Sequence, residues 1–124
     1  MGLLDALRGN AGEIDAGTVQ EEFQPLLADG ERVEKAFSLV RDQIIFTNKR
    51  LIFIDKQGLS GKKQRWLSIP YSKITRFSAE SAGFMDYDAE LDIWVGSAEQ
   101  PLRITLAKGV PIQDVYRILS THML

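Results

Sequence analysis

The chain has 124 residues, of which 44% are hydrophobic and 26% are charged, and its formal net charge is −2 with no cysteine. This length predicts one domain, the absence of cysteine excludes disulfides and thiolate metal sites, and the slightly acidic balance provides no basic field for nucleic acid or an anionic membrane. No apolar run approaches the roughly 20 residues of a membrane span, and the N-terminus lacks the pattern of a signal peptide, so we expect a cytoplasmic protein without a nucleic-acid or membrane partner.

The first 30 residues predict a helical extension at the N-terminus, in which residues 9–17 have the composition of a linker. Thr18 and Glu21 have the spacing of a capping box, which marks the start of a helix. Pro25 predicts that this helix kinks or ends early. The apolar residues recur at the spacing of an amphipathic helix and are Val19, Phe23, Leu26 and Leu27.

Residues 42–55 predict a hairpin of two very apolar strands joined by a two-residue turn at Asn48-Lys49. The pairs that this turn predicts are Phe46 with Leu51 and Ile44 with Phe53 on one face, and Ile45 with Ile52 on the other. Both faces are apolar, so each needs a cover. We expect the first face to join the core with Leu91, Ile93 and Leu119. The second face needs either the helix around Phe23 or a neighbouring subunit, and both alternatives remain open.

Apolar residues alternate along most of the remaining chain, with turn signals between the runs. The further strands that this pattern predicts are residues 33–39, 64–69, 74–81, 85–95 and 101–108. Pro111 and Asp114 then have the positions expected at the start of a terminal helix over residues 110–124. The order predicts a mainly β domain, a seven-stranded sandwich or partly open barrel over residues 31–108, with the C-terminal helix as a cap.

Five short motifs resemble those of the bacterial pleckstrin-homology-like (PH-like) domain family. They are Val40-Arg41-Asp42, Ile45-Phe46-Thr47-Asn48-Lys49-Arg50-Leu51-Ile52, Asp55-Lys56-Gln57-Gly58, Gly61-Lys62-Lys63 and Ile69-Pro70-Tyr71. The resemblance covers the whole chain and implies a single PH-like domain over residues 1–124, with neither enzymatic activity nor a cofactor. It also implies closure into a cyclic homo-oligomer, five-fold for a chain with one such domain, that mediates contact with an unidentified protein partner.

Two tryptophans are expected to point away from the core. If Leu67 and Ile69 point inward, the alternation of a strand directs Trp66 outward, and the same alternation places Trp94 opposite to Leu91 and Ile93. A large exposed aromatic side chain usually marks an interface, although a helix packed on each indole would explain it equally well. We therefore include Trp66 and Trp94 in a hypothetical interface between subunits.

Acidic residues alternate along the strand expected over residues 85–95. Neighbouring members of such a row lie roughly 6.8 Å apart, so they cannot converge on one calcium ion. We expect them instead to pair with Lys73, Arg76 and Arg103, either within the chain or across a subunit boundary. The complete set of residues in the interface hypothesis is Trp66, Trp94, Asp88, Glu90, Arg103, Ile45 and Ile52.

Basic residues flank the glycine-rich turn near residue 60. They are Lys56, Lys62, Lys63 and Arg65. The segment Gly61-Lys62-Lys63 lacks the Ser or Thr that follows the lysine in a Walker loop, so it does not predict a nucleotide site. We expect a solvated loop or a subunit contact, and contact with an anion or a membrane surface is the alternative.

The sequence provides no set of residues for catalysis or metal binding. His122 is the only histidine and lies near the end of the predicted terminal helix, so neither a Ser-His-Asp arrangement nor a metal site is expected. The two-sided apolar hairpin, the outward tryptophans and the family resemblance together predict a non-catalytic, oligomeric binding or scaffold module. A peripheral membrane-surface or anionic-ligand module is the alternative, with Leu3, Leu4, Leu7 and the Lys62-Lys63 turn as its contacts.

Overall fold

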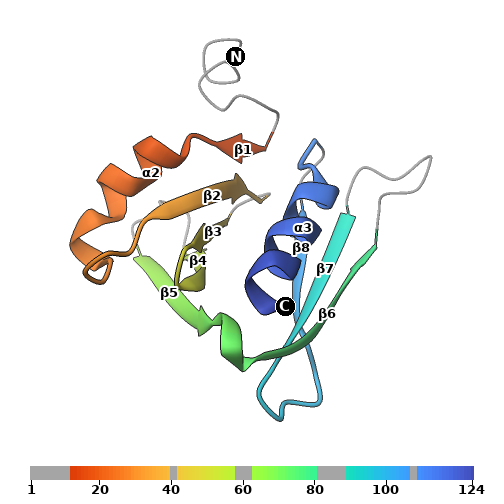
Figure 1. Cartoon of the computed structure of the whole chain (residues 1–124). Helices are drawn as coiled ribbons and strands as arrows, with labels where there is room; N and C mark the ends of the chain where they lie inside the picture. The colour runs from red at the N-terminus through yellow and green to blue at the C-terminus, as the bar shows by residue number, and fades with distance from the viewer. Residues whose placement is uncertain (1–11, 40–41, 58–62, 81–88, 107–108) are drawn as a thin grey trace.

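The computed structural model describes residues 12–39, 42–57, 63–80, 89–106 and 109–124 (Figure 1). Its strands are β1 (Glu13–Ile14), β2 (Val33–Ser38), β3 (Gln43–Thr47), β4 (Arg50–Gln57), β5 (Lys63–Pro70), β6 (Ile74–Glu80), β7 (Ala89–Val95) and β8 (Leu102–Leu106). Its α-helices are α2 (Ala16–Phe23) and α3 (Ile112–Met123), and its 3-10 turns are η1 (Gln24–Leu26) and η2 (Tyr71–Lys73).

The strands form two antiparallel sheets. The first sheet has the order β1-β2-β3-β4-β5, and the second has the order β6-β7-β8. The sheets are not closed into one barrel: among the described residues a bridge between Leu39 and Leu106 connects them on one side, and η2 carries the chain from β5 to β6 on the other. Helix α3 lies between β2 of the first sheet and β6 of the second, as Figure 1 shows. This architecture confirms the predicted mainly β fold with a C-terminal helix.

The β3–β4 hairpin has the predicted register. Phe46 pairs with Leu51, and the turn lies at Asn48 and Lys49. Ile44 pairs with Phe53 in the same ladder. A turn of two residues leaves one possible alignment of the flanking strands, which is why the pairing could be deduced from the turn alone.

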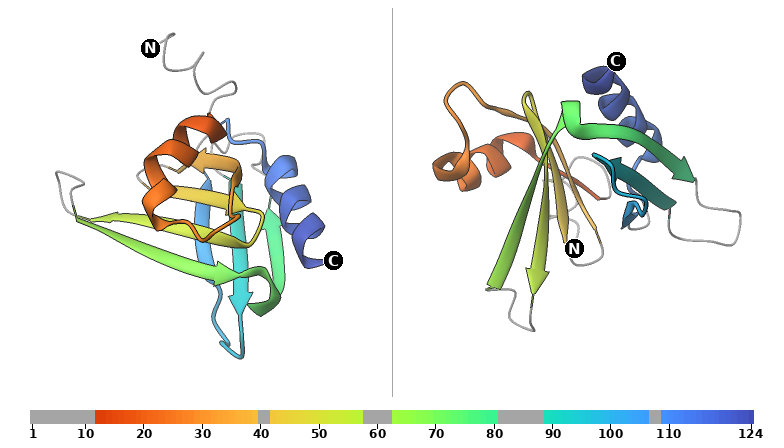
Figure 2. Two further views of the ribbon diagram at one scale, coloured as in Figure 1. Left: turned by 60° about the vertical axis from the view of Figure 1, so that its left-hand side comes forward. Right: turned by 90° about the horizontal axis from the view of Figure 1, so that it is seen from below.

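Each face of the hairpin is covered by a different element of the same chain. The inner face joins the main core between the sheets, which includes Ile44, Phe46, Leu51, Phe53, Leu91, Ile93 and Leu119. The outer face packs against α2, which contributes Val19 and Phe23 to a second cluster with Ile45, Ile52 and Ile54. Figure 2 shows α2 lying across the outer side of this sheet. The sequence left two possible covers for the outer face, the helix around Phe23 or a neighbouring subunit, and in the structure the cover is the chain's own helix α2.

The start of α2 differs from the sequence prediction. The N-cap is Asp15, whose carboxylate accepts hydrogen bonds from the backbone N and the hydroxyl of Thr18, both at 3.0 Å. The predicted capping box at Thr18 and Glu21 is therefore wrong, because Thr18 already lies inside the helix. The end is as predicted: α2 stops at Phe23 and Pro25 lies in the following 3-10 turn.

The segment predicted as a linker also contains regular structure. Within it, Glu13 and Ile14 form β1 and pair with Phe37 and Ala36 of β2. Ile14 packs against the same outer cluster as Phe23, so burial of an isolated apolar residue accounts for this short strand. The seven predicted strands correspond to β2–β8, and β1 adds an edge strand to them. Residues 85–88 of the predicted acidic strand lie outside the described residues.

We expect that Phe23→Ala lowers the free energy of unfolding by about 3 kcal/mol, because it leaves a cavity between α2 and the hairpin. Phe23 is only 6% exposed in the single chain. Urea denaturation measures the effect, and Leu26→Ala is the matched control because Leu26 is 42% exposed on the adjacent turn. A loss below about 1 kcal/mol for Phe23→Ala would contradict the assignment of α2 as the cover of the outer face.

Candidate functional site

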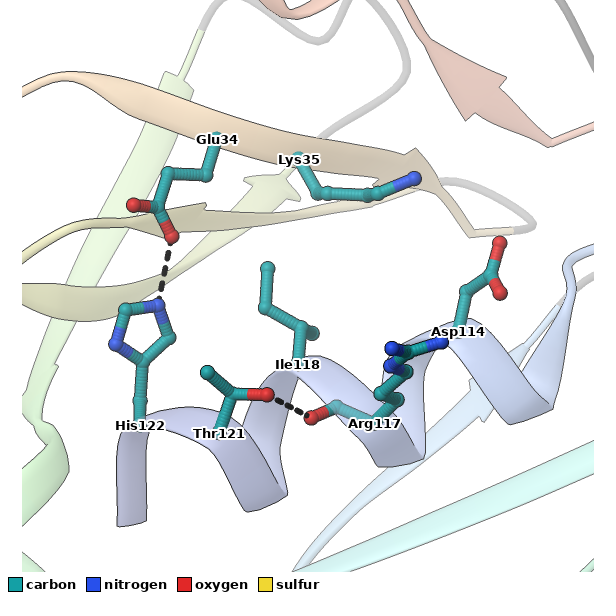
Figure 3. Close-up of a pocket in the computed structure, with 7 residues that line it drawn as sticks. All are labelled: Glu34, Lys35, Asp114, Arg117, Ile118, Thr121 and His122. Atoms are coloured by element: carbon teal, nitrogen blue, oxygen red, sulfur yellow. Dashed lines mark hydrogen bonds and ion pairs between the residues drawn. The ribbon is translucent and has the colours of Figure 1, made fainter. Parts of the chain in front are cut away.

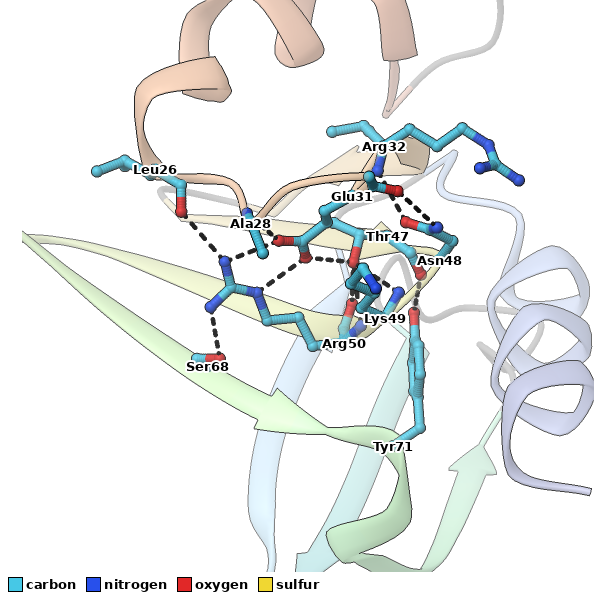
Figure 4. A network of polar contacts seen from close by, with 12 residues as sticks. Leu26, Ala28, Glu31, Arg32, Thr47, Asn48, Lys49, Arg50, Ser68 and Tyr71 are labelled. Carbon is cyan, nitrogen blue, oxygen red and sulfur yellow. Dashed lines mark hydrogen bonds and ion pairs between the residues drawn. The ribbon is translucent and has the colours of Figure 1, made fainter.

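A buried carboxylate ties the segment after α2 to the β3–β4 hairpin (Figure 4). The side chain of Glu31 is fully buried and lies against the guanidinium of Arg50. Arg50 donates from Nε to Oε2 at 2.9 Å and from Nη2 to Oε1 at 3.0 Å, which is the bidentate geometry of a strong ion pair. Thr47 donates its hydroxyl to Oε2 at 2.6 Å, and the backbone N of Ala28 donates to Oε1 at 2.9 Å. All four contacts converge on one carboxylate.

The tight turn of the hairpin is held by the same group of residues. Asn48 accepts a hydrogen bond from the backbone N of Arg32 at 2.7 Å and donates to the carbonyl of Gly30 at 3.1 Å. The hydroxyl of Thr47 accepts from the backbone N of Lys49 and of Arg50, both at 3.0 Å. The Thr-Asn-Lys-Arg motif of the sequence is therefore a structural device that joins residues 30–32 to the hairpin.

Hydrogen bonding determines the ionisation of the buried carboxylate. Burial raises the pKa of Glu31, but hydrogen bonds from Arg50, Thr47 and the backbone of Ala28 outweigh it, so the net pKa is lowered. Glu31 is thus charged at neutral pH although its side chain is buried. A buried ion of this kind is tolerated because its oxygens are satisfied by donors.

A cleft of about 370 Å³ lies between β2 and α3 (Figure 3). Glu34 faces His122 across it, with 2.7 Å between Oε1 and Nε2. The ring of His122 stacks on Tyr71, with ring centres 4.2 Å apart and planes within 2° of parallel. Tyr71 in turn donates its hydroxyl to the carbonyl of Thr47 at 2.7 Å. These contacts attach the end of α3 to both β2 and the hairpin turn.

The contacts in this cleft pack α3 against β2 and η2. Burial, followed by the negative charges of Glu34 and Glu31, raises the pKa of Tyr71, so its hydroxyl remains a donor. The remaining charged lining residues are Lys35, Asp114 and Arg117, and Lys35 is already paired with Glu13 at 3.3 Å. With two acids and two bases besides the histidine, the cleft has no preference for ligands of one charge.

The β5 strand is the free edge of the first sheet, because β4 is its only neighbour among the described strands. Trp66 lies on this strand and is 54% exposed, as expected from the inward direction of Leu67 and Ile69. Its indole N donates to the side chain of Gln64 at 3.2 Å. An open edge with a large exposed aromatic residue is a surface suited to another chain.

Trp94 lies on the outer face of the second sheet, as predicted, but it is partly covered there. The guanidinium of Arg76 lies 4.4 Å from the centre of the indole ring, which is the geometry of a cation–π contact. The indole N of Trp94 donates to the carbonyl of Glu99 at 3.2 Å. Trp94 therefore presents less free surface than Trp66.

The acidic row pairs within the chain at one position. Asp92 lies opposite Arg103, and two hydrogen bonds of 2.9 Å join the carboxylate to the guanidinium. The hydrogen bonds from Arg103 lower the pKa of Asp92. Glu90 faces another carboxylate, that of Glu80, in the register of β6 and β7. Asp88 lies outside the described residues.

The remaining predicted site residues separate into buried and exposed groups. Ile45 is fully buried and Ile52 is 7% exposed, both beneath α2, so their burial does not require a neighbouring subunit. Lys63 and Arg65 are exposed on β5, and Arg65 lies 3.8 Å from Asp55. Lys56 is half-buried on β4. Lys62, the remaining predicted basic residue, lies outside the described residues.

A second hollow is apolar and lies on the inner side of β5. This groove has a volume of about 330 Å³ and opens between β5 and the turn that joins β7 to β8. Its aliphatic lining residues are Leu67, Ile69, Ile93, Val95 and Leu102. These side chains belong to or pack against the main core, so the groove is an open extension of that core.

The described residues offer no metal centre and no membrane-spanning helix. No group of three or more His, Asp or Glu side chains in this part of the chain could hold a metal ion. None of the described helices is long and apolar enough to cross a membrane. The β5 edge and the two hollows are candidate surfaces for function.

The two open sheets with a C-terminal helix between them define the class of the protein as a PH-like domain. A family model described as the bacterial PH domain matches residues 2–123 of the chain. The chain therefore belongs to the bacterial PH domain family, as its sequence motifs indicated. The relation covers almost the whole chain.

Individual relatives support the same assignment. The uncharacterised protein YjqA of Bacillus subtilis is 50% identical over 121 residues, which cover 97% of this chain and 97% of that protein. A DUF1696 family protein with a pleckstrin-homology domain from Shewanella loihica has a TM-score of 0.83 and 40% identity, covering 93% of this chain and 98% of that chain. A pleckstrin homology domain from Shewanella amazonensis also has a TM-score of 0.83, with 44% identity and 99% of each chain covered.

Sequence reasoning missed Glu31, the centre of the polar network. Glu31 follows a turn glycine and precedes a strand, where an acidic residue is ordinarily solvated. The available signal was Arg50, a charged residue between the apolar strands of a hairpin whose two faces both needed cover. A partly buried cation of this kind is stabilised by an anionic partner, although the position of that partner 19 residues away could not be deduced.

We expect that Glu31→Gln lowers the free energy of unfolding by roughly 2–4 kcal/mol at neutral pH, because Arg50 loses its charged partner. The pKa of Glu31 is lower in the folded chain than in the unfolded chain. Its stabilisation is therefore complete above the unfolded pKa of about 4.3 and is lost as the pH falls through the folded value.

Urea denaturation across this pH range measures the difference between wild type and Glu31→Gln. The gap between the two proteins should be largest near neutral pH and should narrow in acid. Glu21→Gln is the matched control, because Glu21 is exposed on α2 and its replacement should leave the profile unchanged. A gap that is constant with pH would contradict the proposed role of the Glu31 charge.

Proposed function

We propose that the chain is a non-catalytic binding module that assembles into a cyclic homo-oligomer through the edge of β5. The observation that carries this proposal is the exposure of Trp66 on β5, whose outer edge has no partner among the described strands. Free strand edges pair readily with other chains, and proteins usually protect them by charge, twist or a partner. A tryptophan at such an edge provides the large apolar contact that dominates many interfaces.

A ring requires each copy to use two different surfaces, since the contact must repeat in one rotational direction and then close. The β5 edge provides the first surface, with Trp66 on its outer face and the exposed Lys63 and Arg65 on the opposite face of the same strand. The second sheet provides a complementary acidic surface, because Glu80 and Glu90 face each other there and repel, with Arg103 of β8 as the nearby cation. A basic edge of the next copy would relieve this repulsion.

Five copies form the proposed ring, and an unidentified protein is the proposed partner of the assembly. The number five follows from the resemblance to single-domain members of the family. The geometry of one chain is also compatible with closed rings of other sizes. The alternative function as an anion-binding module has weaker support, because Asp55 lies 3.8 Å from Arg65 and would compete with a ligand.

We expect that Trp66→Ala weakens each contact between copies by about 2 kcal/mol, which is roughly a thirtyfold rise in its dissociation constant. The physical reason is the loss of the apolar anchor at the edge. Native mass spectrometry and light scattering at micromolar concentration measure the assembly, and thermal unfolding measures the fold. Trp94→Ala should have a smaller effect, because Arg76 already covers that indole.

The matched control is Tyr116→Ala, since Tyr116 is an aromatic residue that is 50% exposed on α3, away from the β5 edge. Its native mass should equal that of the wild type. A wild-type protein that is strictly monomeric at micromolar concentration would refute the proposal. It would also be refuted if Trp66→Ala kept the native mass and only lowered the melting temperature.

A further inference from the structure

The apolar groove on the inner side of β5 has one charged residue in its lining. That residue is Lys73, which lies in η2 at the point where β5 leads into β6. Among the residues that the structure describes, no carboxylate pairs with its amine, and no acidic side chain lines the groove. The groove thus combines an aliphatic surface with a single positive charge.

The polar groups of the groove are otherwise few. Ser68 is a lining residue, but its hydroxyl already accepts a hydrogen bond from Arg50 at 2.9 Å. Gln100 is the other polar side chain in the lining. A sugar or a nucleotide would leave most of its hydrogen-bonding groups without partners here, and burial of such groups costs free energy. The lining therefore selects against polar ligands.

The walls of the groove are held in place before any ligand binds. The backbone N of Gly96 donates to the carbonyl of Lys73 at 2.8 Å, which fixes the β7–β8 turn against η2. Gly96 adopts a positive φ of 61°, a conformation that favours glycine at this position. The backbone N of Ala98 donates to the carbonyl of Val95 at 3.2 Å and tightens the same turn. Pre-formed walls of this kind are typical of sites for small molecules.

We propose that this groove binds a free fatty acid, a saturated carboxylate whose aliphatic chain lies on the core residues and whose carboxylate pairs with Lys73. The volume of about 330 Å³ is at the lower end of the range for small-molecule pockets and is too small for a helix of another protein. The lone positive charge complements a single carboxylate. The ligand would occupy the inner side of β5, whereas the proposed contact between copies uses its outer side and edge.

Isothermal titration of the full-length chain with hexanoate, octanoate and decanoate, each below its micelle concentration, tests the proposal. Every methylene that enters the groove should lower the dissociation constant by about fourfold, which corresponds to 0.8 kcal/mol. The gain should stop once the groove is filled. A complete absence of binding, or an affinity that does not depend on chain length, would overturn the proposal.

Two variants locate the site and its charge. Ala98→Trp places a large ring at the groove from an exposed turn and should weaken decanoate binding by at least tenfold, whereas Ser97→Trp on the same turn should not. Lys73→Met should weaken octanoate binding by roughly three- to tenfold and leave the affinity for 1-octanol unchanged. If Ala98→Trp and Lys73→Met both bind octanoate and decanoate as the wild type does, the proposal is wrong.

The same variants distinguish a fatty acid from a second copy of the chain as the occupant. Sedimentation velocity should give the wild-type mass for Ala98→Trp, with and without decanoate. A lower mass for Ala98→Trp, together with no binding of decanoate to the wild type, would assign the groove to the contact between copies and overturn the proposal.

Discussion

The structure depends on the ion pair between Glu31 and Arg50, because this pair holds α2 over the outer face of the β3–β4 hairpin. Burial of Phe23 against that face supplies the hydrophobic stabilisation, but apolar contact alone does not fix the direction in which the chain leaves a helix. The bidentate contact does fix it, since it requires the segment after α2 to approach the hairpin in one geometry. Arg50 also donates to the carbonyl of Leu26 at 3.2 Å, which fixes the η1 turn as well.

The same network reaches the opposite end of the chain through Tyr71. Its hydroxyl donates to the carbonyl of Thr47, whose own hydroxyl bonds to Glu31, and its ring stacks on His122 of α3. The two helices therefore attach to the hairpin turn from different sides, one at each sheet face. A change at Thr47 would affect both attachments, which gives the short turn motif an importance that its length does not indicate.

The fold could be predicted from the sequence where local rules determine it, and the site only in part. The turn at Asn48 and Lys49 fixed the register of its hairpin, and alternation fixed the outward direction of Trp66. The N-cap of α2 was ambiguous, because Asp15 and Thr18 are both favourable caps and the choice depends on tertiary packing of the helix. The pairing of Asp92 with Arg103 in preference to other bases depends on the register of β8, which no turn signal fixed. The apolar groove joins residues of β5 and β7, which only the assembled fold brings together.

Both faces of the first sheet are covered within the chain, so neither face is available for binding other molecules around the central hairpin. With α2 on one face and the main core on the other, the hairpin at the centre has no free surface, and Ile45 and Ile52 are used within the chain. The sheet edges and the apolar groove on the inner side of β5 remain available for contacts with other molecules. Trp66 and the groove lie on opposite sides of the same strand, since successive side chains of a strand alternate. A contact at the β5 edge and a ligand in the groove beneath it would therefore use different side chains of one strand.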